Sequence, residues 1–230
     1  MDSLIEGLPI LFMSKETPGR EHIAEHTIQA LMEKLGGMYK KLFYCAVSGT
    51  PEYFEKIGAL VRNNGGIFFG VNYPDSTAGQ AWNDMLRKLF GDGHSLYLRL
   101  EDDFYLKSPL DLTPFFKAFE RTPTLSMIRL GLMPIGLKLW STSDKENIYF
   151  ECLAETQYAY SGNPGLIHRR MHDEVGYYHE RKNPGDIEIE FDERVRDRIR
   201  AGKCQIWWPL SLGAYGTYGP WDHIGEVKSY

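Results

Sequence analysis

The chain has few cysteines and no long apolar run, and these two absences exclude several classes of protein. Its 230 residues include only three cysteines, at Cys45, Cys152 and Cys204. Because they are far apart and lack the spacing of a zinc site, we expect buried, reduced thiols rather than disulfides or a cysteine-bound metal. No apolar segment is long enough to span a bilayer, and the N-terminus lacks the basic region of a signal peptide. The sequence therefore predicts a cytoplasmic protein with no transmembrane segment.

The chain also has no excess of positive charge. The 26 Lys and Arg residues and 31 Asp and Glu residues give a formal net charge of −5. A protein with this balance has no general attraction for nucleic acid, although a local basic face would still allow binding. There is no internal repeat, low-complexity tract or change in composition that would mark a linker. A chain of this length can bury a full core, so we expect one domain.

Short apolar runs alternate with helical patterns along the first 130 residues. Strands are expected at 9–13, 42–47, 67–71, 96–100 and 125–130. Helices are expected at 20–35, 51–63, 79–90 and 114–121, each with an apolar stripe at helical spacing. Alternation of this kind predicts an α/β, Rossmann-like fold in which a mostly parallel central sheet carries helices on both faces.

The second half of the chain is less regular. Further strands are expected at 149–153, 165–168 and 204–208, and helices at 169–175 and 187–201. No element is assigned to 132–148, and loops are expected at 177–185 and 211–230.

The segment Ser95–Leu106, SLYLRLEDDFYL, is the centre of this pattern. Its apolar run ends in three consecutive acids, Glu101, Asp102 and Asp103. Because charged side chains are costly to bury, we expect a buried strand that presents these carboxylates at its carboxyl end, where ligands bind in open α/β sheets. Closely spaced carboxylates suit Mg²⁺ or Mn²⁺, which share their ligands with substrate phosphates. A solvated acidic turn is the alternative.

Several short motifs follow one another in an order that matches a known family. The third of three strand–helix units ends in the Asn-bearing helix AWNDML, and the acid triplet follows on the fourth strand. The segments YSGNPGLIHRRMHDEVGYYHE, GDIEIEFDERVRDRIRAG and WDHIG follow. This order resembles GT-A fold glycosyltransferases of the family-2-like kind over roughly residues 8–225, although no single motif is specific. The resemblance implies one catalytic domain over 1–230, with a nucleotide-sugar-binding half at 1–106 and an acceptor-binding half at 107–230.

The resemblance also implies roles for the acid triplet and a late histidine. The family's D-x-D motif reads Glu101-Asp102-Asp103 here, so Asp103 would bind the metal while Glu101 and Asp102 face the ribose or the donor sugar. His223 in WDHIG matches the family's third metal-ligand position. A bound Mn²⁺ or Mg²⁺ would neutralise the charge that develops on the departing nucleoside diphosphate. The first acid is Glu rather than the usual Asp, which leaves its contact open.

The acceptor hydroxyl must lose a proton, and a carboxylate is the usual base. In the family this acid opens the helix after the acceptor segment, where the candidates are Glu188, Glu190, Asp192 and Glu193. Asp192 begins the best acid pair and is the prediction, with Glu190 second. The alternative is an exposed helix face with ion pairs such as Glu190–Arg194. If the base lies here, a single displacement inverts the anomeric configuration.

The residues that would bind the donor are less distinctive. They follow the first and third expected strands or lie in the acceptor segment: Ser14, Lys15, Arg20, Asn72, Gly162 and Asn163. Asp75 belongs to the same group. Gly162 would let backbone approach the donor sugar or the acceptor closely. Each of these residues also has an ordinary interpretation as part of a loop or turn.

The leading hypothesis is a metal-dependent, inverting glycosyltransferase with a UDP-sugar donor. The expected acceptor is a hydroxyl of a glycan or polysaccharide, with a hydroxylated base in DNA as the minority option. One alternative is a nucleotidyltransferase, which normally has a Gly-rich, basic phosphate loop after its first strand. The segment SKETPGR is a poor version of that loop. The other alternative is a non-catalytic module of the same fold that binds a glycan or a partner protein.

Overall fold

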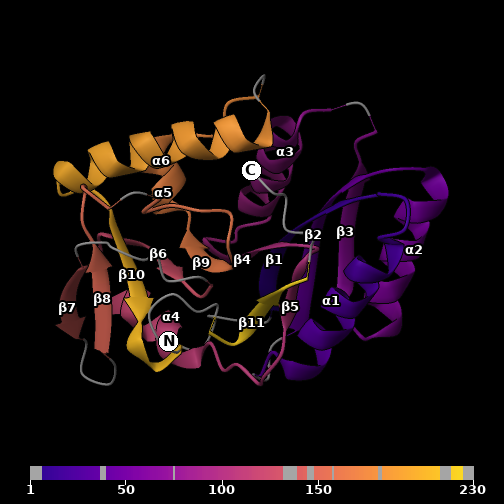
Figure 1. Cartoon of the computed structure of the whole chain (residues 1–230), viewed down its shortest axis with the longest axis horizontal. Coiled ribbons are helices and arrows are strands. Elements are labelled where there is room, and N and C mark those ends of the chain that lie inside the picture. The colour runs from indigo at the N-terminus through magenta and orange to yellow at the C-terminus, as the bar shows by residue number, and fades with distance from the viewer. Residues whose placement is uncertain are drawn as a thin grey trace.

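The computed structural model describes residues 7–36, 40–74, 76–131, 139–143, 148–156, 158–180, 183–212 and 219–224. These residues form a nine-stranded sheet in the order β3-β2-β1-β4-β9-β6-β10-β8-β7 and a small sheet in which β11 pairs with β5 (Figure 1). The strands are β1 Gly7–Lys15, β2 Lys40–Ser48, β3 Ile67–Asn72, β4 Leu96–Glu101, β5 Phe104–Leu106, β6 Leu125–Arg129, β7 Leu139–Ser143, β8 Ile148–Cys152, β9 Gly165–His168, β10 Gln205–Pro209 and β11 Trp221–His223. The helices are α1 Glu21–Lys34, α2 Pro51–Asn63, α3 Ala78–Gly91, α4 Thr113–Arg121, α5 Arg170–Val175 and α6 Pro184–Arg200.

The main sheet is mostly parallel, as the alternating pattern predicts. Strands β3, β2, β1 and β4 pair in parallel, and so do β6 and β10. Strand β9 lies antiparallel between β4 and β6, and β8 lies antiparallel between β10 and β7. Within the described residues only β9 and β8 therefore run against the other strands. The carboxyl ends of β1, β2 and β4 meet at one edge of the sheet, which is where the acid triplet begins.

Helices cover both faces of the sheet because the strand side chains alternate between two cores. On β1, Ile10 and Phe12 face the core under α1, α2 and α4, whereas Leu11 faces the core under α3, α5 and α6. On β2, Phe43 and Tyr44 divide in the same way. Figure 1 shows α3 and α6 on one side of the sheet and α1 and α4 on the other. The α/β fold class with helices on both faces is therefore confirmed.

Three differences from the expected elements concern the second half of the chain. Strand β7, Leu139–Ser143, forms inside the stretch to which no element was assigned. Helix α6 begins at Pro184, so this residue opens the helix rather than ending the preceding loop, and Asn183 caps it by accepting a hydrogen bond from the Asp186 amide at 2.9 Å.

The third difference is that β11, Trp221–His223, forms within the expected tail loop. It pairs antiparallel with β5, which follows the acid triplet and was also not expected. Of the expected tail loop at 211–230, the structure describes only residues 211–212 and 219–224.

The expectations for the cysteines and for membrane-spanning segments can be compared with the structure. Cys45, Cys152 and Cys204 are buried and free, as predicted for reduced thiols. None of the described helices combines the length and the apolar character needed to cross a bilayer.

Candidate active site

The acid triplet lies where β4 ends and turns toward β5. Glu101 is the last residue of β4, and the amide of Asp102 donates to the carbonyl of Met13 on β1 at 3.0 Å. The Asp102 carboxylate accepts hydrogen bonds from the Ser14 hydroxyl at 2.7 Å and from the Lys15 amide at 3.2 Å. Burial raises the pKa of Asp102 to about 6, although the bond from Ser14 opposes this shift. The structure therefore brings Ser14, Lys15 and Asp102 together at the edge of the sheet.

Asp103 contacts a residue from the opposite end of the chain. The His223 imidazole donates through Nε2 to Asp103 Oδ2 at 3.1 Å, and the Arg20 guanidinium lies 3.8 Å from the same oxygen. The hydrogen bond to Asp103 raises the pKa of His223 above its usual value. Two predicted metal ligands, Asp103 and His223, are thus adjacent, and Arg20 lies beside them.

The donor atoms of this pair fit a divalent cation. Asp103 Oδ1 is buried and has no hydrogen-bond partner among the described residues, which is costly for a carboxylate oxygen. Carboxylate and imidazole are both ligands of first-row divalent cations, with carboxylate oxygen suited to Mn²⁺ and Mg²⁺. The described part of the chain holds no cluster of three or more His, Cys, Asp or Glu side chains arranged for a metal. A cation held here would need further ligands from a bound phosphate or from water.

Glu101, the first acid of the triplet, is held by a buried arginine. The Arg99 guanidinium donates to Glu101 Oε1 at 2.8 Å and lies 4.5 Å from the centre of the Trp82 ring. Burial raises the pKa of Glu101 to about 7, and the positive charge of Arg99 counteracts part of that rise. Arg99 itself is only 5% exposed, so its charge depends on this carboxylate.

The acceptor segment meets the acid edge at Gly162. The amide of Gly162 donates to the carboxylate of Glu188 on α6. A Cβ atom at Gly162 would lie 3.0 Å from Arg99 Nη1 and Glu188 Oε1, and 3.1 Å from Glu101 Oε1. Such contacts are tighter than ordinary van der Waals packing, so a side chain at this position would displace these groups by a few tenths of an ångström. Glu188 and Glu101 therefore approach each other across Gly162.

The two acids that the sequence ranked first as base have other partners. Asp192 is 3% exposed, and its carboxylate accepts the amides of Tyr160 at 2.8 Å and Tyr158 at 3.2 Å. It also forms an ion pair with Arg196 at 3.1 Å. Glu190 pairs with Arg194 at 2.7 Å, which is the ion pair that the sequence offered as the alternative interpretation. The catalytic role of Asp192 and Glu190 stays a prediction, and Glu188 is the acid of this group that lies nearest Glu101.

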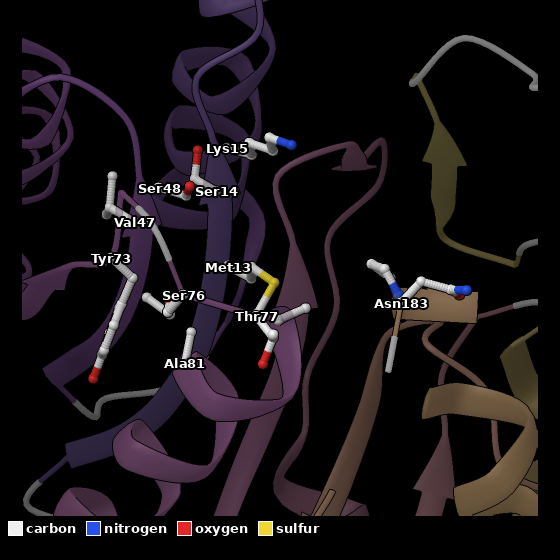
Figure 2. A pocket seen from close by; sticks show the side chains of 13 residues that line it. Met13, Ser14, Lys15, Val47, Ser48, Tyr73, Ser76, Thr77, Ala81 and Asn183 are labelled. Atoms are coloured by element: carbon white, nitrogen blue, oxygen red, sulfur yellow. The ribbon is translucent and has the colours of Figure 1, made fainter. Parts of the chain in front are cut away.

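A pocket of about 450 Å³ opens at the carboxyl ends of β1 and β2 (Figure 2). Its walls come from the ends of β1 and β2, the loop before α3, the first turn of α3 and the start of α6. In Figure 2, Ser14 and Ser48 lie on one side of Met13 and Asn183 on the other. Ser14 lines the pocket and also donates to Asp102. The pocket therefore borders the acid edge directly.

The remaining predicted donor residues have structural contacts. The Asn72 side chain donates to the carbonyl of Gly49 at 3.0 Å and does not line the pocket. Asn163 donates to the Ser161 hydroxyl at 2.9 Å, next to Gly162. Asp75 lies outside the described residues.

Sequence reasoning overlooked two buried arginines that hold the site. Arg129 is 1% exposed and donates to the carbonyl of Tyr158 at 2.6 Å and to the Ser161 hydroxyl at 2.8 Å. Arg99 holds Glu101 through a hydrogen bond of 2.8 Å. Each arginine interrupts an apolar strand, in LYLRLE and SMIRL, and a charge inside a buried strand requires a partner. That signal was present in the sequence and could have identified both residues.

No protein-family model matches the chain, and no curated protein matches its sequence. Solved structures match its fold. S. aureus TarS aligns with a TM-score of 0.59 and 11% identity over 93% of this chain and 37% of that one. The 1–349 portion of TarS in complex with UDP gives a TM-score of 0.57 and 11% identity over 91% of this chain and 59% of that one. The chain thus spans less than two thirds of TarS.

A structure of a different protein aligns with this chain over almost the whole length of both. The apo form of a UDP-glucose pyrophosphorylase aligns with a TM-score of 0.56 and 11% identity over 96% of this chain and 94% of that one. At such identities the likeness shows the fold alone. The expectation drawn from the acid triplet and the later motifs is confirmed at this level: the chain has the GT-A fold, which it shares with TarS.

Proposed function

We propose that this protein is a metal-dependent, inverting glycosyltransferase that moves a sugar from a UDP-sugar to an acceptor hydroxyl. One observation carries the proposal: the pocket at the ends of β1 and β2 shares Ser14 with the acid edge, and Glu188 approaches that edge from the other side. A donor with its nucleoside in the pocket would have its diphosphate beside Asp102 and Asp103. The UDP complex of TarS, a structure of the same fold, supports a uridine nucleotide as the ligand.

Asp103 and His223 would hold the divalent cation, with Asp103 Oδ1 as the free oxygen. The bound cation supplies charge neutralisation at the diphosphate, so that UDP is a better leaving group. Ser14 and the Lys15 amide fix Asp102 at the same edge. Arg99 holds Glu101 beside Gly162, in the space where the donor sugar would lie.

Glu188 is the acid that we assign as the general base. The acceptor oxygen bonds to the anomeric carbon as its proton moves to the Glu188 carboxylate and the bond to the diphosphate breaks, which inverts the configuration in one step. The hydrogen bond from the Gly162 amide fixes the orientation of that carboxylate. Asp192, one helical turn further along α6, has both oxygens occupied and is less suited to accept a proton.

The test measures release of UDP and transfer of label from radiolabelled UDP-glucose, UDP-galactose and UDP-N-acetylglucosamine with Mn²⁺. Wild type should transfer label to an added glycan acceptor, and Glu188→Gln should lower kcat by about 10²–10⁴-fold. Glu193→Gln, an exposed acid on the same helix, is the matched control and should retain activity. Full activity in Glu188→Gln would refute the assignment of the base.

A second candidate is a nucleotidyltransferase that joins UTP to a sugar 1-phosphate. It is favoured by the match to UDP-glucose pyrophosphorylase, which covers almost all of both chains. Against it, SKETPGR at the end of β1 has one glycine and two separated basic residues, which makes it a poor version of a typical triphosphate loop. Release of pyrophosphate from UTP and glucose 1-phosphate, without transfer from UDP-glucose, would favour this candidate. Absence of both reactions and of nucleotide binding would favour a non-catalytic binding module.

The acceptor is the least constrained part of the proposal. A glycan or polysaccharide hydroxyl is the first choice, and a hydroxylated base in DNA is the minority option. The net charge of −5 supports this order, because a polyanion gains little from an acidic protein.

A further inference from the structure

One tyrosine in the acceptor segment has a backbone conformation that its side chain disfavours. Tyr158 has φ of +56°, and it is the only non-glycine residue with positive φ in the described part of the chain. A bulky side chain in this left-handed region costs free energy, and such strain persists only when the surroundings fix it. Tyr158 is nevertheless 44% exposed, so packing in a core does not explain the conformation.

Two buried charged residues fix the backbone of Tyr158 on both sides. Its amide donates to Asp192 Oδ2 at 3.2 Å, and its carbonyl accepts from Arg129 Nη1 at 2.6 Å. Asp192 is 3% exposed and Arg129 is 1% exposed. Asp192 and Arg129 also hold the Tyr160 amide and the Ser161 hydroxyl, so two buried charges fix the whole segment and with it the position from which the Tyr158 side chain projects.

Tyr158 lies along helix α6 from the proposed base, Glu188. Tyr158 is attached to Asp192, which lies four residues after Glu188 on α6, a rise of about 6 Å along the helix. Four residues after Tyr158, Gly162 donates to Glu188 itself. The segment 158–162 therefore runs along α6 from the exposed ring to the base. Ile189, the residue after Glu188, is also exposed, at 47%.

We propose that Tyr158 is the stacking platform for the acceptor, and that the acceptor is a neutral sugar ring whose apolar face lies on the tyrosine ring. This inference rests on the proposed glycosyltransferase function and adds the class of acceptor. An exposed aromatic ring offers a large, rigid apolar surface to such a ligand. Of the five acids at residues 184–193 of α6, two form ion pairs with arginines one turn further along, and the other three, Asp186, Glu188 and Glu193, oppose a polyanionic acceptor such as DNA.

The test compares Tyr158→Gly, Tyr158→Asn and Tyr158→Phe in transfer from a UDP-sugar to methyl glycosides of neutral pyranoses. Gly and Asn tolerate positive φ, so both remove the ring while keeping the backbone conformation. We expect both variants to raise the KM for the glycoside about tenfold, with the KM for the donor and the Kd for UDP unchanged. Tyr158→Phe keeps the ring and should stay within about twofold of wild type. Ile67→Ala removes a similarly exposed apolar side chain at the opposite end of the sheet and is the matched control.

The outcomes separate this inference from the proposed function. If wild type releases UDP from no donor, the proposed function fails and the platform fails with it. If wild type transfers sugar to glycosides but Tyr158→Gly and Tyr158→Asn have the wild-type KM for the glycoside, only the platform is overturned. Transfer to an oligonucleotide containing hydroxymethylated pyrimidines, with none to any glycoside, would overturn the neutral acceptor.

Discussion

The His223 imidazole lies 3.1 Å from the Asp103 carboxylate, although 120 residues separate them in sequence. The contact exists because β11 pairs with β5 in a register that sets His223 opposite Phe104, the neighbour of Asp103. The carbonyl of Asp103 also accepts the Ile224 amide at 2.8 Å. The late histidine therefore reaches the acid edge through a small sheet rather than through a loose tail.

The first prediction concerns the cation. With Mn²⁺ and UDP at about 100 times Kd, wild type should gain about 2.7 kcal/mol in free energy of unfolding, equivalent to a Tm rise of about 5–10 °C. Asp103→Asn removes the charge and the free oxygen, so it should lose the Mn²⁺-dependent part of that rise. Differential scanning fluorimetry with and without Mn²⁺ measures the effect.

Asp222→Asn is the matched control for this experiment. Asp222 is the neighbour of His223 and pairs with Lys107 at 2.9 Å on the exposed side of the small sheet. Its variant should retain the full shift. A Mn²⁺-dependent shift that survives in Asp103→Asn would remove Asp103 from the metal site.

The second prediction concerns Gly162. An added Cβ would press on Arg99, Glu188 and Glu101 at 3.0–3.1 Å, and each of these atoms is at the end of a side chain that can move. We therefore expect Gly162→Ala to fold with a Tm within about 3 °C of wild type while kcat/KM falls about 10–100-fold, because the carboxylates are displaced. Gly91→Ala, where a Cβ meets no atom within 4 Å, is the control. Equal activity in both variants would argue against a role for this junction.

The fold could be predicted where local signals and packing agree. Helix α2 has the expected bounds, since Pro51 begins it and Gly65, with φ of +84°, follows its end. The central residues of β1 and β2, at 8–13 and 42–47, are apolar because both faces of the sheet are covered. Strands β5 and β11 have three residues each and depend on pairing with each other, so no local pattern could reveal them.

The site could be predicted in part, and the position of the general base on α6 could be predicted only to within one helical turn. Glu188 and Asp192 lie four residues apart and therefore on the same face of α6. Sequence spacing cannot decide which of the two meets the acid edge, because that depends on where the segment 158–162 contacts the helix. Asp103 and His223 come together as the family resemblance implied, and the division of function at residue 106 stays a prediction.

The third prediction separates these two acids. Asp192→Asn keeps the shape but turns an amide group toward donors that now bind a carboxylate, so it should lower the free energy of unfolding by about 2–4 kcal/mol. At a temperature where the variant is folded, kcat should stay within about tenfold of wild type. Urea unfolding and single-temperature kinetics test the two parts, with Glu193→Gln as the control. A loss of kcat of a hundredfold or more in a stable Asp192→Asn protein would restore Asp192 as the base.

The last prediction concerns pH and the buried His172. Its Nε2 lies 2.7 Å from the Tyr97 hydroxyl, and its Nδ1 lies 3.2 Å from the carbonyl of Gly176. Burial lowers the pKa of His172 to about 4, so the unfolded chain binds this proton at a higher pH than the folded protein does. Below the usual pKa of about 6.5, protons therefore favour the unfolded state, and the stability that this residue contributes at pH 7 is lost as the pH falls toward 4.

The contribution of His172 to stability must be separated from that of two buried acids, which change stability with pH in the opposite direction. The pKa values of Asp102 and Glu101 are raised, so their carboxyl groups are bound to protons in the folded protein at a pH where the unfolded chain has lost them, and they favour folding as the pH falls. Comparing wild type with His172→Phe cancels that contribution. Between pH 7 and pH 5, wild type should lose about 2 kcal/mol more free energy of unfolding than His172→Phe does, measured by urea denaturation. His22→Asn, at an exposed position on α1, should follow the wild-type profile. Parallel profiles for wild type and His172→Phe would mean that the pKa of His172 is the same in the folded and unfolded states.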